Sequence, residues 1–134
     1  MEIKMTCRLC QKQRELRRSH VFPEFLYKHA YDEKHRYEIA SLAGEWLAGN
    51  HQSGIWERLL CDECEKRLNK LETYSSLILH GLQAVEINAS DGDQAYVLGL
   101  GVDYKRFKLF LLSLVWRASI SSRSPFAGVA LGEH

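Results

Sequence analysis

The four cysteines of the chain fall in two C-x-x-C pairs, Cys7/Cys10 and Cys61/Cys64, with fifty residues between the pairs. Two intervening residues let both thiolates of a pair approach one ion from a tight turn, and two such turns complete a tetrahedral zinc site. A redox role for either pair is the alternative, but no thioredoxin-like βαβ pattern surrounds them. The spacing therefore predicts one structural zinc bound by all four cysteines.

A histidine stands in the stretch RRSHVFPEF, ten residues after the first cysteine pair. His20 could act as a base, as a metal ligand or as a polar residue that hydrogen-bonds within a hairpin. Residues 1 to 36 carry nine Lys/Arg and five Asp/Glu, an excess that either attracts phosphates or forms a solvated basic face. Arg17 and Arg18 are candidate phosphate contacts, and alternation along a strand would direct only one of them toward a site.

The order of these motifs, CRLC, SHVFPEF and CDEC, resembles the zinc-bound members of the HNH endonuclease family over residues 7 to about 72. The resemblance implies a ββα-metal fold, with His20 as the general base of phosphodiester hydrolysis in DNA, or in RNA, and a catalytic Mg²⁺ or Mn²⁺. Ser19 stands where the family often has an acid or histidine, and the family's middle Asn has no clear match. Glu65 follows the second pair, where the family usually has Asn or His.

Glu65 has two candidate roles. A carboxylate is a good ligand for Mg²⁺ or Mn²⁺, so Glu65 is a candidate ligand of the catalytic ion. Alternatively, Glu65 completes a capping box with Asp62 as the N-cap of the helix that follows. The departures from the family pattern also leave a second functional hypothesis, a catalytically inactive zinc-ribbon module that binds nucleic acid or a partner protein.

The elements that would position these residues are predicted from local patterns. A strand is expected over residues 15–22 within a short hairpin, and Pro23 suits the first turn of a helix. Residues 37–42 could form a strand, and 43–54 form a turn-rich insertion. A helix is expected from Asp62 to a stop at Gly81, with Leu68, Leu71, Ser75 and Ile78 on one face.

The remaining sequence predicts a hairpin over residues 84–100, with SDGD as its turn, and a helix over about 104–119 that is apolar nearly all round. The apolar helix should be buried on several sides. A second copy of the chain, or a C-terminal region absent from it, is expected to cover this helix.

The chain as a whole has 134 residues, 46% of them hydrophobic, and a formal net charge of +1, which suits a globular protein with a substantial core. The expected fold class is α+β, with a zinc-stapled HNH-like domain over residues 1–81 and the hairpin and apolar helix over 82–134. The N-terminus lacks a signal-peptide pattern, and the apolar run 107–116 is too short to cross a bilayer, so a cytoplasmic protein without membrane contact is expected.

Overall fold

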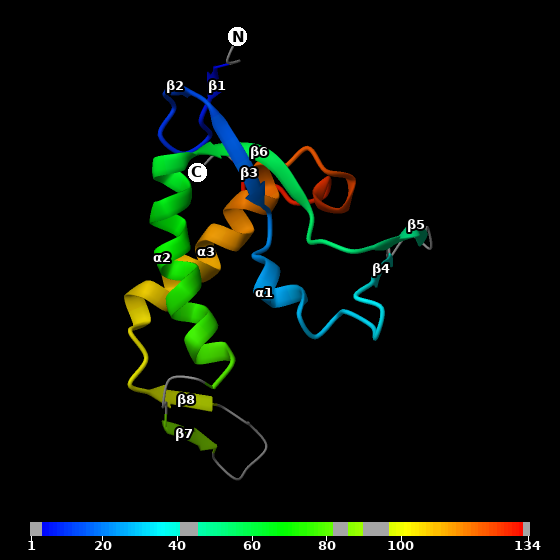
Figure 1. Cartoon of the computed structure of the whole chain (residues 1–134). Helices are drawn as coiled ribbons and strands as arrows, with labels where there is room; N and C mark the ends of the chain where they lie inside the picture. The colour runs from blue at the N-terminus through cyan, green and yellow to red at the C-terminus, as the bar shows by residue number, and fades with distance from the viewer. Residues whose placement is uncertain (1–3, 41–45, 82–85, 90–96, 133–134) are drawn as a thin grey trace.

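The computed structural model describes residues 4–40, 46–81, 86–89 and 97–132. Within these ranges the chain mixes helices with four two-stranded antiparallel sheets, which confirms the α+β class. The helices are α1 (Glu24–Tyr27), α2 (Asp62–Leu79), α3 (Tyr104–Ile120) and the 3-10 helix η1 (Ser124–Phe126). Figure 1 shows α2 and α3 side by side, with strands β3 and β6 across one end of them.

The first cysteine pair lies in a small hairpin, β1 (Met5–Thr6) with β2 (Gln13–Arg14), which we call the knuckle (residues 5–14). Inside it the Cys7 N–H donates to the Lys12 carbonyl at 2.9 Å and the Gln11 N–H donates to the Cys7 carbonyl at 2.9 Å. Gln11 adopts a φ of 60°, a left-handed conformation that lets the chain reverse so tightly. The tight turn expected around the first cysteine pair is thus present.

Strand β3 (Leu16–His20) lies within the expected strand at 15–22, but it pairs with β6 (Trp56–Cys61). The expectation that this strand belongs to a short local hairpin is therefore wrong. The two strands run antiparallel, with Leu16 opposite Cys61 and His20 opposite Trp56. Because β6 returns toward the start of β3, its last residue arrives beside the knuckle. This long-range pairing brings the two cysteine pairs together.

The segment between β3 and β6 contains α1 and a hairpin of β4 (Tyr37–Ala40) with β5 (Trp46–His51). The strand expected at 37–42 is present in its described part. The turn-rich character expected for 43–54 is wrong over 46–51, because cross-strand hydrogen bonding to β4 makes this stretch a strand. Helix α1 is a single turn that directly follows Pro23.

Helix α2 runs from Asp62 to Leu79, close to the predicted range. Gly81 has a φ of 66° and its N–H donates to the Ile78 carbonyl at 3.1 Å, which confirms the predicted glycine stop. The predicted capping box is wrong: Cys61 is the N-cap residue, and no side chain caps the helix. Asp62 is already helical, and its carboxylate accepts from Lys66 at 2.7 Å.

Beyond α2, strands β7 (Glu86–Ala89) and β8 (Val97–Leu100) form the predicted hairpin, at the end of α2 far from the knuckle (Figure 1). The SDGD turn at 90–93 lies outside the described residues. Helix α3 follows, and its N-cap Asp103 accepts a hydrogen bond from the Arg106 N–H at 3.1 Å.

Helix α3 packs on α2 along one face, where Phe110, Ser113, Arg117 and Ala118 are buried. The expectation that the helix is buried on several sides is wrong within the described residues. Its remaining surface exposes large apolar side chains, namely Leu109, Leu111, Leu112 and Val115. Among the described residues, no helix is both long enough and apolar enough to cross a membrane.

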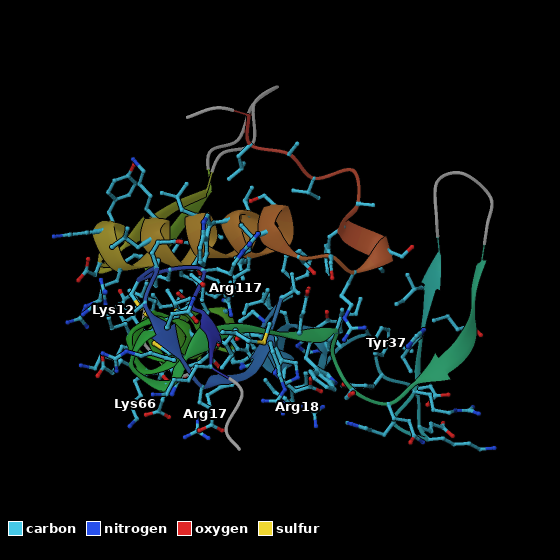
Figure 2. All side chains as sticks on the ribbon, turned by 90° about the horizontal axis from the view of Figure 1, so that it is seen from above. Lys12, Arg17, Arg18, Tyr37, Lys66 and Arg117 are labelled. Carbon is cyan, nitrogen blue, oxygen red and sulfur yellow. The ribbon has the colours of Figure 1, made fainter. Side chains whose placement is uncertain are left out.

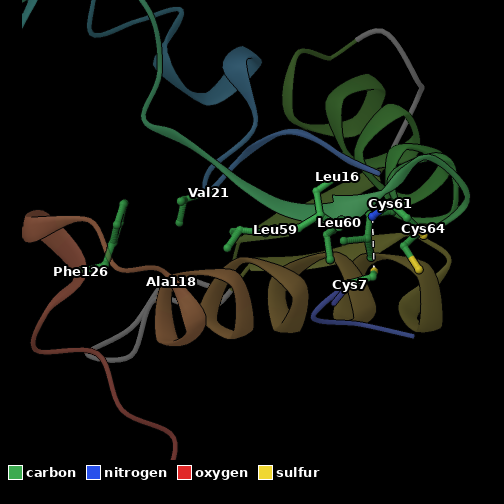
Figure 3. Packing of buried hydrophobic residues seen from close by; sticks show 10 residues of the cluster. Cys7, Leu16, Val21, Leu59, Leu60, Cys61, Cys64, Ala118 and Phe126 are labelled. Carbon is green, nitrogen blue, oxygen red and sulfur yellow. Dashed lines mark hydrogen bonds between the residues drawn. The ribbon is translucent and has the colours of Figure 1, made fainter. Parts of the chain in front are cut away.

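The hydrophobic core lies between β6, the knuckle and the C-terminal half of α3, as Figure 3 shows. It joins Leu16, Leu59 and Leu60 with Ala118 of α3 and with Phe126 of η1. Phe126 also contacts the Phe22 ring edge-on, with centroids 5.2 Å apart. The core therefore anchors the segment that follows α3 (residues 121–132, called the C-terminal segment) directly against the β3–β6 pair.

Candidate metal centre and adjacent pocket

The four predicted cysteines meet at one point of the structure. Their sulfur atoms all lie within 4.8 Å of one another, and the Cys10 and Cys61 Sγ atoms are 3.9 Å apart. A tetrahedral zinc with Zn–S bonds of ~2.3 Å would need sulfur atoms about 3.8 Å apart. The cluster thus needs only a small contraction to hold a metal ion, and its all-thiolate chemistry is compatible with structural zinc.

Three parts of the chain hold the cysteines. Cys7 and Cys10 lie on the knuckle turn, whereas Cys61 ends β6 and Cys64 lies in the first turn of α2. The Cys61 N–H donates to the Cys7 Sγ at 3.3 Å, the bond drawn as a dashed line in Figure 3. The positive end of the α2 dipole also faces the cluster, which favours thiolates over thiols.

The thiols of the cluster differ in acidity. Burial works to raise the pKa of Cys7, but backbone N–H groups of Cys10 and Cys61 that point at its sulfur outweigh burial and lower the pKa to about 6. Burial and hydrogen bonds with the other thiols raise the pKa of Cys64. Thiols this close share protons, and a cation that binds them displaces those protons.

A pocket of about 390 Å³ lies next to the cluster, between β3, α1 and α2. Three of the four residues predicted around the scissile phosphate line it: His20, Glu65 and Arg18. Arg17 does not line the pocket, and its Nε lies 3.4 Å from Oδ1 of Asp62. Only one of the two arginines thus reaches the pocket, but strict alternation is not the reason, because the register of β3 with β6 shifts between Leu16 and Arg18 and both side chains are exposed.

His20 lies at the end of β3 and is contacted from two directions. Its Nε2 lies 3.4 Å from Oε2 of Glu24, on the first turn of α1. Its backbone carbonyl accepts a hydrogen bond from Nη1 of Arg117 at 2.9 Å. The ring is thus oriented by a carboxylate, and the backbone that carries it is anchored by α3.

Glu24 is itself held firmly. Its carboxylate accepts from the Gly54 N–H at 2.9 Å and from the Tyr31 hydroxyl. Burial acts to raise the pKa of Glu24, but these hydrogen bonds outweigh burial and lower it. A side chain at position 54 would lie 2.7 Å from the Tyr27 ring and 2.8 Å from Glu24, so only glycine allows this close approach.

Glu65 faces Ser19, the residue that departs from the family pattern. The Ser19 hydroxyl donates to Oε1 of Glu65 and accepts from the Leu60 N–H at 3.2 Å. Burial raises the pKa of Glu65, and the bond to Ser19 and the charge of Arg117 only partly offset this effect. The side chain therefore serves the β3–α2 contact and the pocket, and has no capping role.

Arg117 was not singled out from the sequence, although it interrupts an apolar helix. Its guanidinium is 1% exposed and lies between α3 and α2, where Nη2 is 2.7 Å from Oε1 of Glu72. Figure 2 shows Arg117 between α3 and the rest of the chain, whereas Arg18 projects on the side away from α3. Arg117 and Glu72 both line the pocket, so they add one buried ion pair to its wall.

Arg18 packs over the Trp56 ring, with its guanidinium carbon 3.7 Å from the ring centroid. Arg123, beyond α3, also approaches this ring, at 5.7 Å. Cation–π contacts of this kind orient a guanidinium without neutralising it. Arg18 thus keeps its charge available beside His20.

Outside the cysteine cluster, the described residues contain no further group of three His, Cys, Asp or Glu side chains whose ligand atoms converge on one point. Comparisons with family models, curated proteins and solved structures find no match to this chain. Its function must therefore be inferred from the pocket and the cysteine cluster themselves.

Proposed function

We propose that the chain is a metal-dependent endonuclease of the HNH type that hydrolyses phosphodiester bonds in DNA. The observation that carries this proposal is the placement of His20. It ends a strand, opens into a pocket, has a carboxylate at 3.4 Å and shares that pocket with Arg18. A histidine oriented by a carboxylate and placed beside a cation is suited to activate water next to a phosphate.

The surrounding elements support the same proposal. Strands β3 and β6, followed directly by α2, follow the order of a ββα-metal unit, with the segment of residues 21–55 inserted between the strands. A zinc ion bound by the four cysteines would join the start of β3 to the start of α2. This zinc is structural, because four thiolates leave no open coordination position for water.

His20 would take the proton of the attacking water, and Glu24 would stabilise the imidazolium that results. Arg18 would hold a phosphate of the DNA backbone near His20. Mg²⁺ usually binds through one or two carboxylates together with substrate phosphates, so Glu65 is the candidate protein ligand. When bound there, Mg²⁺ or Mn²⁺ would stabilise the charge that develops on the phosphate and on the leaving oxygen.

The test is nicking of a supercoiled plasmid by the purified chain with Mg²⁺ or Mn²⁺. We expect His20→Ala to lower the nicking rate by about 10²-fold or more, because a general base typically contributes that much. His29→Ala is the matched control, since His29 is exposed and outside the pocket. Equal rates for wild type and His20→Ala, at unchanged zinc content, would refute the role of His20.

A second candidate is a zinc-ribbon module that binds nucleic acid without cutting it. Its supporting observation is that the pocket carboxylates already have partners: Glu65 binds Ser19 and Glu72 binds Arg117. If the wild-type chain cleaves neither DNA nor RNA with any divalent ion, yet binds duplex with strong salt dependence, this second function holds.

A further inference from the structure

A second surface feature lies on α2 and α3, outside the candidate site. It is a groove of about 740 Å³ between the two helices, next to the knuckle. Leu68 and Leu71 of α2 form one wall, and Leu109, Leu112 and Trp116 of α3 form the other. The proposed nuclease uses none of these side chains.

The spacing of the wall residues fits a helical ligand. On α3 the three residues recur at i, i+3 and i+7, so they form one stripe along the helix. Leu112 is 54% exposed and Leu109 43% exposed, which leaves much of this stripe in contact with water. Two packed helices with an apolar groove between them form the receptor surface of helix-in-groove recognition, and an exposed apolar patch typically marks an interaction site.

The charged residues that line the groove are positive within the described part of the chain. Arg67 and Lys70 border it from α2 and Arg106 borders it from α3, and none of the described acidic residues lines it. Arg106 has Asp103 at 3.3 Å, whereas Arg67 and Lys70 form no ion pair with any other described residue. A ligand that complements this groove must therefore combine apolar side chains with negative charge.

We propose that this groove binds an amphipathic helix of a partner protein, with Leu-like side chains against the apolar walls and Asp or Glu facing Arg67 and Lys70. A second copy of the chain fits less well, because a two-fold interface through the groove would oppose the same cations of both copies. Nucleic acid also fits less well, because its phosphates would bind the cations but would leave the leucine side chains exposed to water. The proposal does not depend on nuclease activity.

The test uses a displayed library of helical peptides. Their apolar positions recur at i, i+3, i+4 and i+7, and the flanking positions are randomised among Asp, Glu, Lys, Arg and Ser. After selection against the full-length chain, affinities of single labelled peptides are measured by fluorescence anisotropy. We expect the selected peptides to be enriched in Asp and Glu and to bind more weakly as salt increases.

Two matched pairs of variants locate the binding surface. Leu112→Gln should weaken peptide binding about tenfold, because it removes apolar area buried in the complex. Leu111→Gln should not, since Leu111 is similarly exposed on the same helix but does not line the groove. Lys70→Glu should weaken the acidic peptides, whereas Lys108→Glu, outside the groove, should leave their affinity unchanged.

Several outcomes would overturn the proposal: no binder selected, no acidic enrichment, or equal effects of Leu112→Gln and Leu111→Gln. A dimer seen by light scattering and dissociated by Leu112→Gln would assign the groove to a second copy. Displacement of the peptides by duplex DNA, with DNA binding lost in Leu112→Gln, would assign it to nucleic acid. Circular dichroism checks that each variant is folded, and Leu109→Gln replaces Leu112→Gln if the latter unfolds.

Discussion

The ion pair between Arg117 and Glu72 helps to hold the backbone of His20 in place. Arg117 donates to the carbonyl of His20 at 2.9 Å, so one guanidinium links the end of β3 to both long helices. Buried charges of this kind contribute little net stability as a pair, but each is costly when its partner is removed. The pair therefore fixes the position of β3 relative to α2 and α3.

Replacing Arg117 alone should be strongly destabilising. Arg117→Met leaves Glu72 without its partner, and we expect a loss of about 3–5 kcal/mol in the free energy of unfolding. The double variant Arg117→Met/Glu72→Leu should recover most of this loss, because it removes both charges. Urea unfolding of the three proteins measures the two differences. A double variant as unstable as Arg117→Met would show that the hydrogen bond to His20 matters more than the ion pair.

The cysteine cluster connects the knuckle, β6 and the start of α2. Because metal binding at such a site is coupled to folding, Cys61→Ser should lower both zinc content and thermal stability. We expect zinc to fall from one ion per chain to a fraction of one and the apparent Tm to fall by about 10 °C or more. Elemental analysis and a thermal melt measure both. Structural zinc would be excluded if the purified wild-type chain contained no zinc and a chelator left its Tm unchanged.

Elements defined by local patterns could be predicted from the sequence, and elements defined by distant partners could not. Helix α2 and its stop at Gly81 follow from periodicity and from one glycine in a left-handed conformation. The pairing of β3 with β6 depends on residues about forty positions away. The N-cap of α2 was assigned to Asp62 instead of Cys61 for a related reason: the Cys61 N–H donates to the Cys7 sulfur, a partner that lies 54 residues away in the sequence.

The same distinction between local patterns and distant partners applies to the residues of the candidate site. The four cysteines could be identified because the spacing within each pair is local. His20 was a candidate because of its place in the order of motifs, and the sequence left open which of Arg17 and Arg18 lines the pocket. Arg117 could not, because its place beside His20 arises only when α3 packs against the β3–β6 pair. Glu24 resembles an ordinary solvated residue in the first turn of a helix, and only the approach of Gly54 shows that its carboxylate is held.

The C-terminal segment is attached to the rest of the molecule through Glu57 of β6. Its carboxylate accepts from the Ser121 hydroxyl at 2.9 Å and from the Ser122 N–H and hydroxyl at 2.9 and 2.7 Å. Burial acts to raise the pKa of Glu57, but the bonds from Ser122 and Ser121 outweigh burial and lower it below its usual 4.5. The ionised side chain thus stabilises the folded chain.

The contribution of Glu57 should depend on pH. Since its pKa is lower in the folded chain, its stabilisation is fully present above pH 4.5 and is lost as the pH falls through the lowered pKa. Glu57→Gln should cost roughly 1–3 kcal/mol at neutral pH and much less in acid. Urea unfolding across this pH range measures the difference, with exposed Glu33→Gln as the control. A cost that does not change with pH would show that the charge of Glu57 is unimportant.

The segment between β3 and β6 (residues 21–55) can change in length at a small cost in free energy. The entropy lost on closing a loop grows slowly, by about 0.6 kcal/mol for each doubling of its length. Among the described residues, the hydrophobic cluster around β6, the knuckle and α3 includes none from the β4–β5 hairpin, and Tyr37 of β4 is buried instead beside the rings of Tyr27 and His51. Figure 1 shows this hairpin projecting away from α2. The chain should therefore tolerate insertions or deletions in this hairpin while the cysteine cluster, His20 and the β3–β6 pair keep their positions.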